Sequence, residues 1–162
     1  MKLTAHRTSS TQKGFTLIEL LVVIGILAIL LAITLIAINP ARQFAQSNNT
    51  KRSSDVNAIL NAVNQYMADN KGSLTGLGVT MDTTAQTISS TTFNSFCAAL
   101  VPQYIAALPT DPLTNNGASV ASTDCTSTTA WSTGYTIAQG ATNRLTVSAP
   151  AAELGATINV SR

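Results

Sequence analysis

The longest hydrophobic stretch of the chain runs without a charge from Leu20 to Ile38, nineteen residues in all. As a helix it would be about 28 Å long, close to the ~30 Å hydrocarbon core of a bilayer. The segment before it is basic at both ends, with Lys2 and Lys13, and basic flanks favour the cytoplasmic side. We therefore predict one membrane-spanning helix over 15–38, with the N-terminus in the cytoplasm and the remainder outside.

A second pattern begins at Ala41 and has the period of an amphipathic helix. Its apolar stripe consists of Val56, Ile59, Leu60, Val63, Tyr66 and Met67. The opposite face is expected to carry Asp55, Asn57, Asn61, Asn64 and Gln65. The stripe predicts a helix over 39–71 that packs under a globular head, and Lys71-Gly72 is a typical helix end.

Asn39-Pro40 lies between the two patterns. Proline removes a backbone donor and biases the preceding residue away from the helical conformation. Two outcomes are open. One long helix kinks here, or a new helix starts with Asn39 as its N-cap and Pro40 as its first residue.

The third pattern is one of short elements. Apolar and polar residues alternate at 135–137, 145–147 and 158–160, which predicts antiparallel strands. A short helix is predicted over 92–101, where an apolar face comprises Phe93, Phe96, Cys97 and Leu100. The Ser/Thr-rich stretch 74–90 is either a flexible linker or part of the head. The fold class is therefore α+β, a long N-terminal helix packed on a small antiparallel sheet in a head over 72–162.

Glu19 is the one ionisable residue between Lys13 and Asn39. A carboxylate in a membrane segment costs a few kcal/mol and usually has a function. The run from Lys13 through Gly14-Phe15-Thr16-Leu17-Ile18-Glu19 into the apolar stretch resembles the class III signal peptide of type IV pilins and of type II secretion pseudopilins. The resemblance covers 13–38 closely, and the C-terminal half only in general pattern.

The resemblance implies that a prepilin peptidase removes the leader 1–14 by cutting between Gly14 and Phe15, and that Phe15 is then N-methylated. It also implies that the subunit polymerises with itself into a helical fibre, on an inner-membrane platform with a separate cytoplasmic ATPase. Glu19 would pair with the α-amine of Phe15, in its own chain or in an adjacent subunit, because an unpaired carboxylate is costly in a fibre core. The alternative is a single-span membrane anchor with no role in assembly.

Composition and charge narrow the function. After Gly14 the chain has 148 residues, six of them basic and seven acidic, so nothing resembles the basic surface of a nucleic-acid binder. The single histidine, His6, lies in the leader, and no nucleophile–base pair or nucleotide motif is present. We therefore expect that the chain is not an enzyme and does not bind nucleic acid directly.

Two cysteines, Cys97 and Cys125, lie in the predicted external head. An even count in an exported domain favours a disulfide. The alternative is a pair of buried free thiols.

A metal site is a weaker prediction, and we expect no cofactor. Leu108-Pro109-Thr110-Asp111-Pro112 resembles a turn found in pseudopilins and small pilins, and in major pseudopilins the region beyond it holds calcium. Oxygen ligands of the kind calcium takes are available from Asp111, Asn115, Asn116 and Asp124. Their spacing fits no loop template, and such residues in turns usually stabilise the backbone.

Three functions remain. The chain is a type IV pilin, building a surface filament for adhesion, motility or DNA uptake; a pseudopilin, building a periplasmic pseudopilus for secretion; or a single-span anchored head that never polymerises. Glu19 and the Gly14-Phe15 junction argue against the third function. The paired cysteines and the absence of a calcium-loop pattern favour the pilin.

Overall fold

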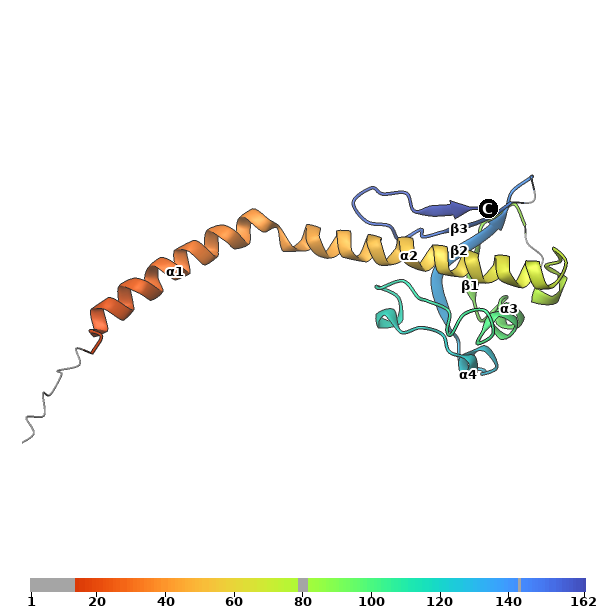
Figure 1. The fold of residues 1–162 in the computed structure, drawn as a ribbon, viewed down its shortest axis with the longest axis horizontal. Coiled ribbons are helices and arrows are strands. Elements are labelled where there is room, and N and C mark those ends of the chain that lie inside the picture. Colours follow the sequence, from red (N-terminus) through yellow and green to blue (C-terminus); the bar gives the residue numbers. More distant parts are fainter. Residues whose placement is uncertain (1–13, 79–81, 143) are drawn as a thin grey trace, which may run out of the picture. The chain divides into compact units, whose positions relative to one another are not determined.

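The structure is a computed structural model that describes residues 14–78, 82–142 and 144–162. Contacts divide the chain into two units, 1–40 and 41–162. Figure 1 shows the elements of each unit in order along the chain.

Among its described residues, 14–40, unit 1 contains one helix, α1, Leu17–Ile38. Its 22 residues would span about 33 Å, enough to cross a membrane, and its apolar side chains are exposed along its length. The helix ends at Asn39, whose backbone is left-handed with φ 47°, and α2 begins at Pro40. Of the two outcomes open for Asn39-Pro40, the structure has a break with a new helix. Asn39 is the C-cap of the first helix, and Pro40 takes the first position of the second.

Unit 2 is built on α2, Pro40–Asp69. The predicted stripe is buried at Val56, Ile59, Leu60, Val63 and Tyr66, with Met67 packed at its edge. The prediction for Asp55 is wrong. This residue is buried with the stripe. Hydrogen bonds from Lys51 and Tyr135 to its carboxylate compensate the cost of burying the charge.

A four-stranded antiparallel sheet completes the head, in the order β1 (Gln86–Ser89), β2 (Ser132–Gln139), β3 (Leu145–Ser148) and β4 (Asn159–Ser161). Buried positions alternate along β2 and β3, so one sheet face points inward. The side chains Ile88, Tyr135, Ile137, Leu145 and Val147 share one core with α2. The α+β fold is confirmed. β1 was not predicted, and it lies in the stretch for which a linker was the alternative.

Short helices cover the rest of the core. These are α3 (Asn94–Leu100) and α4 (Ser122–Cys125), with the single-turn helices η1 (Thr75–Leu77) and η2 (Asn115–Gly117). The four side chains predicted for one face, Phe93, Phe96, Cys97 and Leu100, are all buried. Cys97 and Cys125 form a disulfide with a Cα–Cα distance of 5.3 Å, which joins α3 to α4.

Candidate functional site

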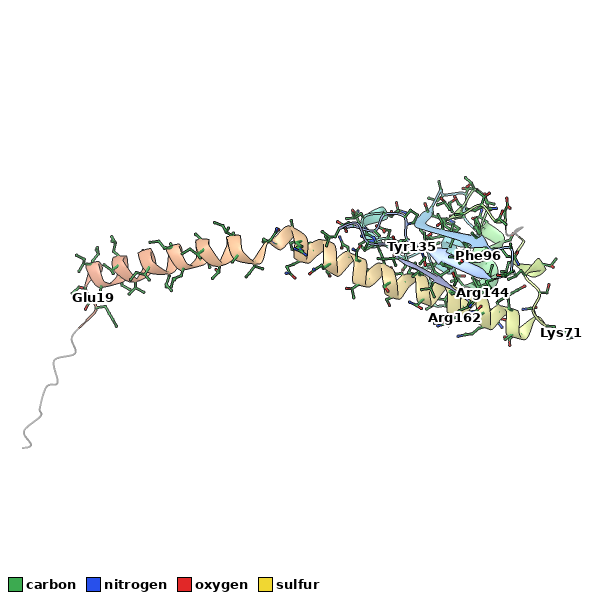
Figure 2. All side chains as sticks on the ribbon, turned by 90° about the horizontal axis from the view of Figure 1, so that it is seen from above. Glu19, Lys71, Phe96, Tyr135, Arg144 and Arg162 are labelled. Carbon is green, nitrogen blue, oxygen red and sulfur yellow. A yellow bond between two sulfur atoms is a disulfide. The ribbon has the colours of Figure 1, made fainter. Side chains whose placement is uncertain are left out.

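The first candidate site is the N-terminal end of α1, where Thr16 and Glu19 form a capping box (Glu19 is labelled in Figure 2). The Thr16 amide and hydroxyl donate to Glu19 Oε2 at 2.8 and 2.7 Å, and the Glu19 amide donates to Thr16 Oγ1 at 3.3 Å. Two amides at the helix start are thus satisfied reciprocally. The sequence analysis missed this function, although Thr16-Leu17-Ile18-Glu19 carries the pattern of such a box.

Phe15 and Glu19 lie on the same side of the helix. Together with Ile18, Val22 and Val23 they line a shallow, almost entirely apolar depression. Phe15 precedes Thr16, the extended N-cap, so it lies just before the first helical turn, which contains Glu19. Both hydrogen bonds from Thr16 end on Oε2, and Oε1 accepts neither of them. The arrangement can therefore keep its cap and still accept a positively charged donor.

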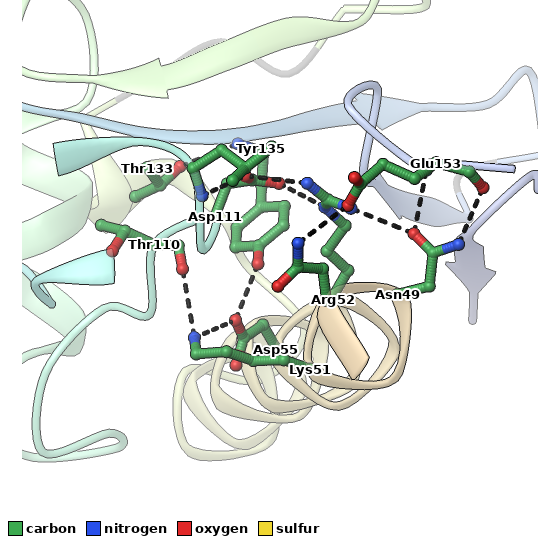
Figure 3. Close-up of polar contacts among 11 residues, drawn as sticks. Asn49, Lys51, Arg52, Asp55, Thr110, Asp111, Thr133, Tyr135 and Glu153 are labelled. Atoms are coloured by element: carbon green, nitrogen blue, oxygen red, sulfur yellow. Dashed lines mark hydrogen bonds and ion pairs between the residues drawn. The ribbon is translucent and has the colours of Figure 1, made fainter. Parts of the chain in front are cut away.

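The second candidate site is a buried polar cluster in unit 2 (Figure 3). Arg52, on α2, is fully buried, and its Nε and Nη2 donate to the two carboxylate oxygens of Asp111 at 2.6 and 3.1 Å. Its Nη1 donates to Glu153 Oε2 at 2.7 Å and to Asn49 Oδ1 at 3.0 Å. We call Asn49, Arg52, Asp111 and Glu153 the Arg52 cluster. One guanidinium thus holds the 108–112 turn and the C-terminal region against the same helix.

Residues 149–158 link β3 to β4, and we call this segment the strap. Its Glu153 accepts from Asn48 Nδ2 at 2.9 Å. The Glu153 backbone also exchanges two bonds with the Asn49 amide side chain, at 2.8 and 2.9 Å. The strap is therefore fastened to α2 by side-chain and main-chain bonds together.

Lys51 and Tyr135 extend the polar contacts to the middle of the sheet. Lys51 Nζ donates to Asp55 Oδ2 at 2.7 Å and to the Thr110 carbonyl at 3.2 Å. Tyr135, on β2, donates its hydroxyl to the same Asp55 oxygen at 2.7 Å. Burial, and then this bond to a carboxylate, raise the pKa of Tyr135, so the phenol remains protonated. The residue is a structural donor.

The charged groups of the Arg52 cluster shift one another's pKa values. Burial alone would raise the pKa of Asp111, but hydrogen bonds from Arg52 and from the Leu113 amide hold that pKa below its ordinary value. Arg52, followed by Asn48, lowers the pKa of Glu153. The bond to Asp111 raises the pKa of Arg52 despite its burial. All three groups are therefore ionised at neutral pH.

The predicted calcium ligands are used differently. Asp111 Oδ1 and Oδ2 bind Arg52, and Oδ1 also accepts from the Leu113 amide at 2.9 Å. Asp124 accepts from the Ala121 amide at 2.8 Å, and Asn115 and Asn116 form a turn with left-handed backbones. Among residues 14–78, 82–142 and 144–162, no group of three or more His, Cys, Asp or Glu side chains is placed to share a metal ion. The turn-stabilising alternative describes these residues.

Comparison with known proteins gives one match. The model of the prokaryotic N-terminal methylation motif matches residues 9–35, which include the Gly14-Phe15 junction, the capping box and most of α1. No curated protein and no solved structure gives a significant match to the chain.

Proposed function

We propose that this chain is a structural subunit of a type IV pilus. It carries the class III signal peptide of the type IV pilin and pseudopilin family. The observation that supports this most strongly is Glu19. It is a carboxylate in the first turn of an exposed, membrane-length helix, within the segment matched by the methylation motif. A structural subunit needs an assembly contact and no catalytic group.

Processing follows from the same segment. We propose that a prepilin peptidase cuts between Gly14 and Phe15, removes 1–14 and leaves 15–38 as the membrane and fibre-core helix. The amphipathic segment 39–71 and the head 72–162 then stay outside. The cut creates an α-amine at Phe15, and N-methylation keeps it basic. The new charge arises just before the first turn of α1, which contains Glu19.

Glu19 would then have two functions. Its Oε2 caps the helix that contains it, and its charge attracts the Phe15 amine of an adjacent subunit. In a low-dielectric fibre core both charges are costly alone and favourable as a pair. A subunit that arrives out of register leaves both groups unpaired, so the pair also sets the axial position of each subunit.

One feature of the head favours a pilus over a periplasmic pseudopilus that binds calcium. The Arg52 guanidinium occupies the Asp111 carboxylate that a calcium ion would require. The disulfide that joins α3 to α4 suits a head exported from the cytoplasm, in either kind of fibre. The platform and its ATPase would act on the subunit at the inner membrane, and the product would be an extracellular filament.

The test uses the full chain in its host. Deletion of the gene should abolish long surface filaments seen by electron microscopy, and the intact mass of purified subunit should correspond to N-methylated 15–162. Gly14→Leu should leave the longer precursor in the membrane. Filament subunits that retain residues 1–14 would refute the assignment, and short periplasmic fibres with secretion defects would indicate the pseudopilin.

A further inference from the structure

The last strand of the sheet buries little side-chain surface. β4 lies at the sheet edge and pairs with β3; it is the arrow that ends at the mark C in Figure 1. Asn159 and Ser161 are exposed, and Val160 is half-buried at the rim of the core. Arg162 adds a side-chain bond to Asn61 of α2. Segments with so little buried apolar surface are the ones that open first, so β4 can separate while the rest of the sheet stays folded.

The segment before β4 is an exposed turn between two fixed points. At one end, Glu153 is fastened to α2 by two bonds through its carboxylate and two through its backbone. At the other end, the Ile158 carbonyl accepts from the Ala149 amide at 2.9 Å, next to β3. Residues 154–157 lie between these points, and all of them are exposed. We call 154–157 the hinge.

The hinge is held in a strained conformation. Leu154 has φ +59° and Gly155 has φ +69°, so the turn places a leucine in the left-handed region that favours Gly and Asn. A hydrogen bond from the Ala156 amide to the Glu153 carbonyl, at 3.1 Å, closes the turn. An extended hinge would return Leu154 to an ordinary conformation and would lose only this bond, which water can replace. Extension therefore relieves strain, provided that β4 finds an equivalent place to bind.

An equivalent place exists on every other copy of the chain. The register that sets Thr146 opposite Ser161 can form within one chain or between two, because the strands are identical. The closed and exchanged forms then share their contacts and differ mainly in the hinge and in the local concentration of copies. Fully extended, the chain from Glu153 to Ile158 reaches at most about 17 Å. A head within that distance can receive the strand.

We propose that two copies of the chain exchange β4, with 154–157 as the hinge and Glu153 held on α2 of its own subunit. The inference goes beyond the proposed function, because it requires only that two heads lie within reach, in a pilus, a pseudopilus or the membrane. Each exchanged strand ties one head to the next through backbone hydrogen bonds. Separating the two subunits then requires that β4 be pulled out of a sheet.

The first experiment traps the exchange with cysteines. Thr146 Oγ1 and Ser161 Oγ lie 2.7 Å apart on neighbouring strands, so cysteines at these positions are within reach of a disulfide. Full chains carrying Thr146→Cys and full chains carrying Ser161→Cys are co-expressed in the host. Membrane and filament fractions are oxidised briefly and examined on non-reducing gels with peptide mapping. A bridge between positions 146 and 161 then requires β4 of one copy on β3 of another.

The matched control is Thr136→Cys co-expressed with Ser148→Cys. These positions are also opposite each other, on β2 and β3, but both lie outside the exchanged strand. We expect dimers linked through 146 and 161 at no less than ten times the control yield. A yield at the control level in both fractions would overturn the exchange. Absence of filaments from the unaltered chain would overturn the proposed function alone, and the membrane fraction would still decide the exchange.

The second experiment tests the hinge. Leu154→Asn suits the left-handed conformation, so in the cysteine-trapping pair it should stabilise the closed form and lower the yield of linked dimer at least threefold. Lys71→Asn is the matched control, because Lys71 has φ +56° and lies outside the hinge, and it should leave the yield unchanged. An unchanged yield with Leu154→Asn, or an equal fall with Lys71→Asn, would overturn the hinge on which the proposal depends.

Discussion

Arg52 and Asp111 lie 59 residues apart and form a two-point ion pair with no exposed side-chain surface on Arg52 and 1% on Asp111. The pair joins the middle of α2 to the turn that precedes η2. Glu153 then binds the same guanidinium from the strap. Three segments distant in sequence thus depend on one side chain, and the consequences can be measured.

Removing the guanidinium should destabilise the head strongly. Arg52→Met leaves Asp111 buried without its counter-ion, and loss of one partner of a buried pair costs about 3–5 kcal/mol. Denaturant unfolding of the full chain in detergent, followed by the fluorescence of the buried Trp131, measures the loss. Lys51→Met is the matched control, because Lys51 is half exposed and its pair with Asp55 contributes about 0–1 kcal/mol. Equal losses from both variants would contradict the central position of Arg52.

Acid should loosen the same region. The native-state pKa values of Asp111 and Glu153 lie below their ordinary values, so the stability they contribute is present above the unfolded pKa values of about 4 and is lost as pH falls through the native ones. We expect constant stability from pH 7 to about 5 and a decline below about 4. Thermal melts across this pH range check whether stability falls as the pH is lowered. In Arg52→Met the decline should be shallower, and an equally steep decline there would assign the acid sensitivity to other groups.

The two functions of Glu19 can be separated by substitution. Glu19→Gln keeps a side chain that can cap the Thr16 amide but removes the charge, so it should be processed and inserted normally yet give few or no filaments. Thr16→Ala weakens the capping box by about 1 kcal/mol and keeps the charge, so filaments should persist in reduced number. Counts by electron microscopy, with immunoblots for processed subunit, provide the readout. If Glu19→Gln assembles normally and Glu19→Ala does not, capping and not charge is what assembly requires.

The disulfide should matter for the head alone. Replacing Cys97 and Cys125 by serine removes the link between α3 and α4 and should lower stability by about 2–4 kcal/mol. Membrane insertion should be unchanged, because α1 belongs to the other unit. Non-reducing peptide mapping of native subunit should find one linked pair. Free thiols at both positions would contradict the bond.

The sequence predicted the elements that its periodicity describes. α1 and the stripe of α2 follow from long, regular patterns, and the later strands from clear alternation. β1 was missed because Gln86-Thr87-Ile88-Ser89 contains one buried apolar residue among polar ones and obtains its order by pairing with β2. Such a strand is defined by a partner more than forty residues away, which no local pattern reveals.

The Arg52 cluster was missed for the same reason, although one signal was available. Arg52 and Asp55 fall at helical spacing from Val56 and Ile59, so both belong to the buried side of α2. Reading charged residues as exposed assigned Asp55 to the wrong face. The partners of these two residues could not be predicted, because Tyr135 reaches Asp55, and the strap reaches Arg52, only through the finished sheet.

The C-terminal segment decides when the head becomes complete. Residues 145–162 supply β3, β4, Glu153 and the Arg162 side chain, which donates to Asn61 Oδ1 at 2.6 Å (Arg162 is labelled in Figure 2). They are synthesised after β2, and until they are present β2 lacks its β3 partner and Arg52 lacks one carboxylate. A truncated or stalled subunit would thus stay unclosed and open to proteolysis. Closure of the head therefore depends on residues 145–162, because these residues supply both β3 and the second carboxylate of Arg52.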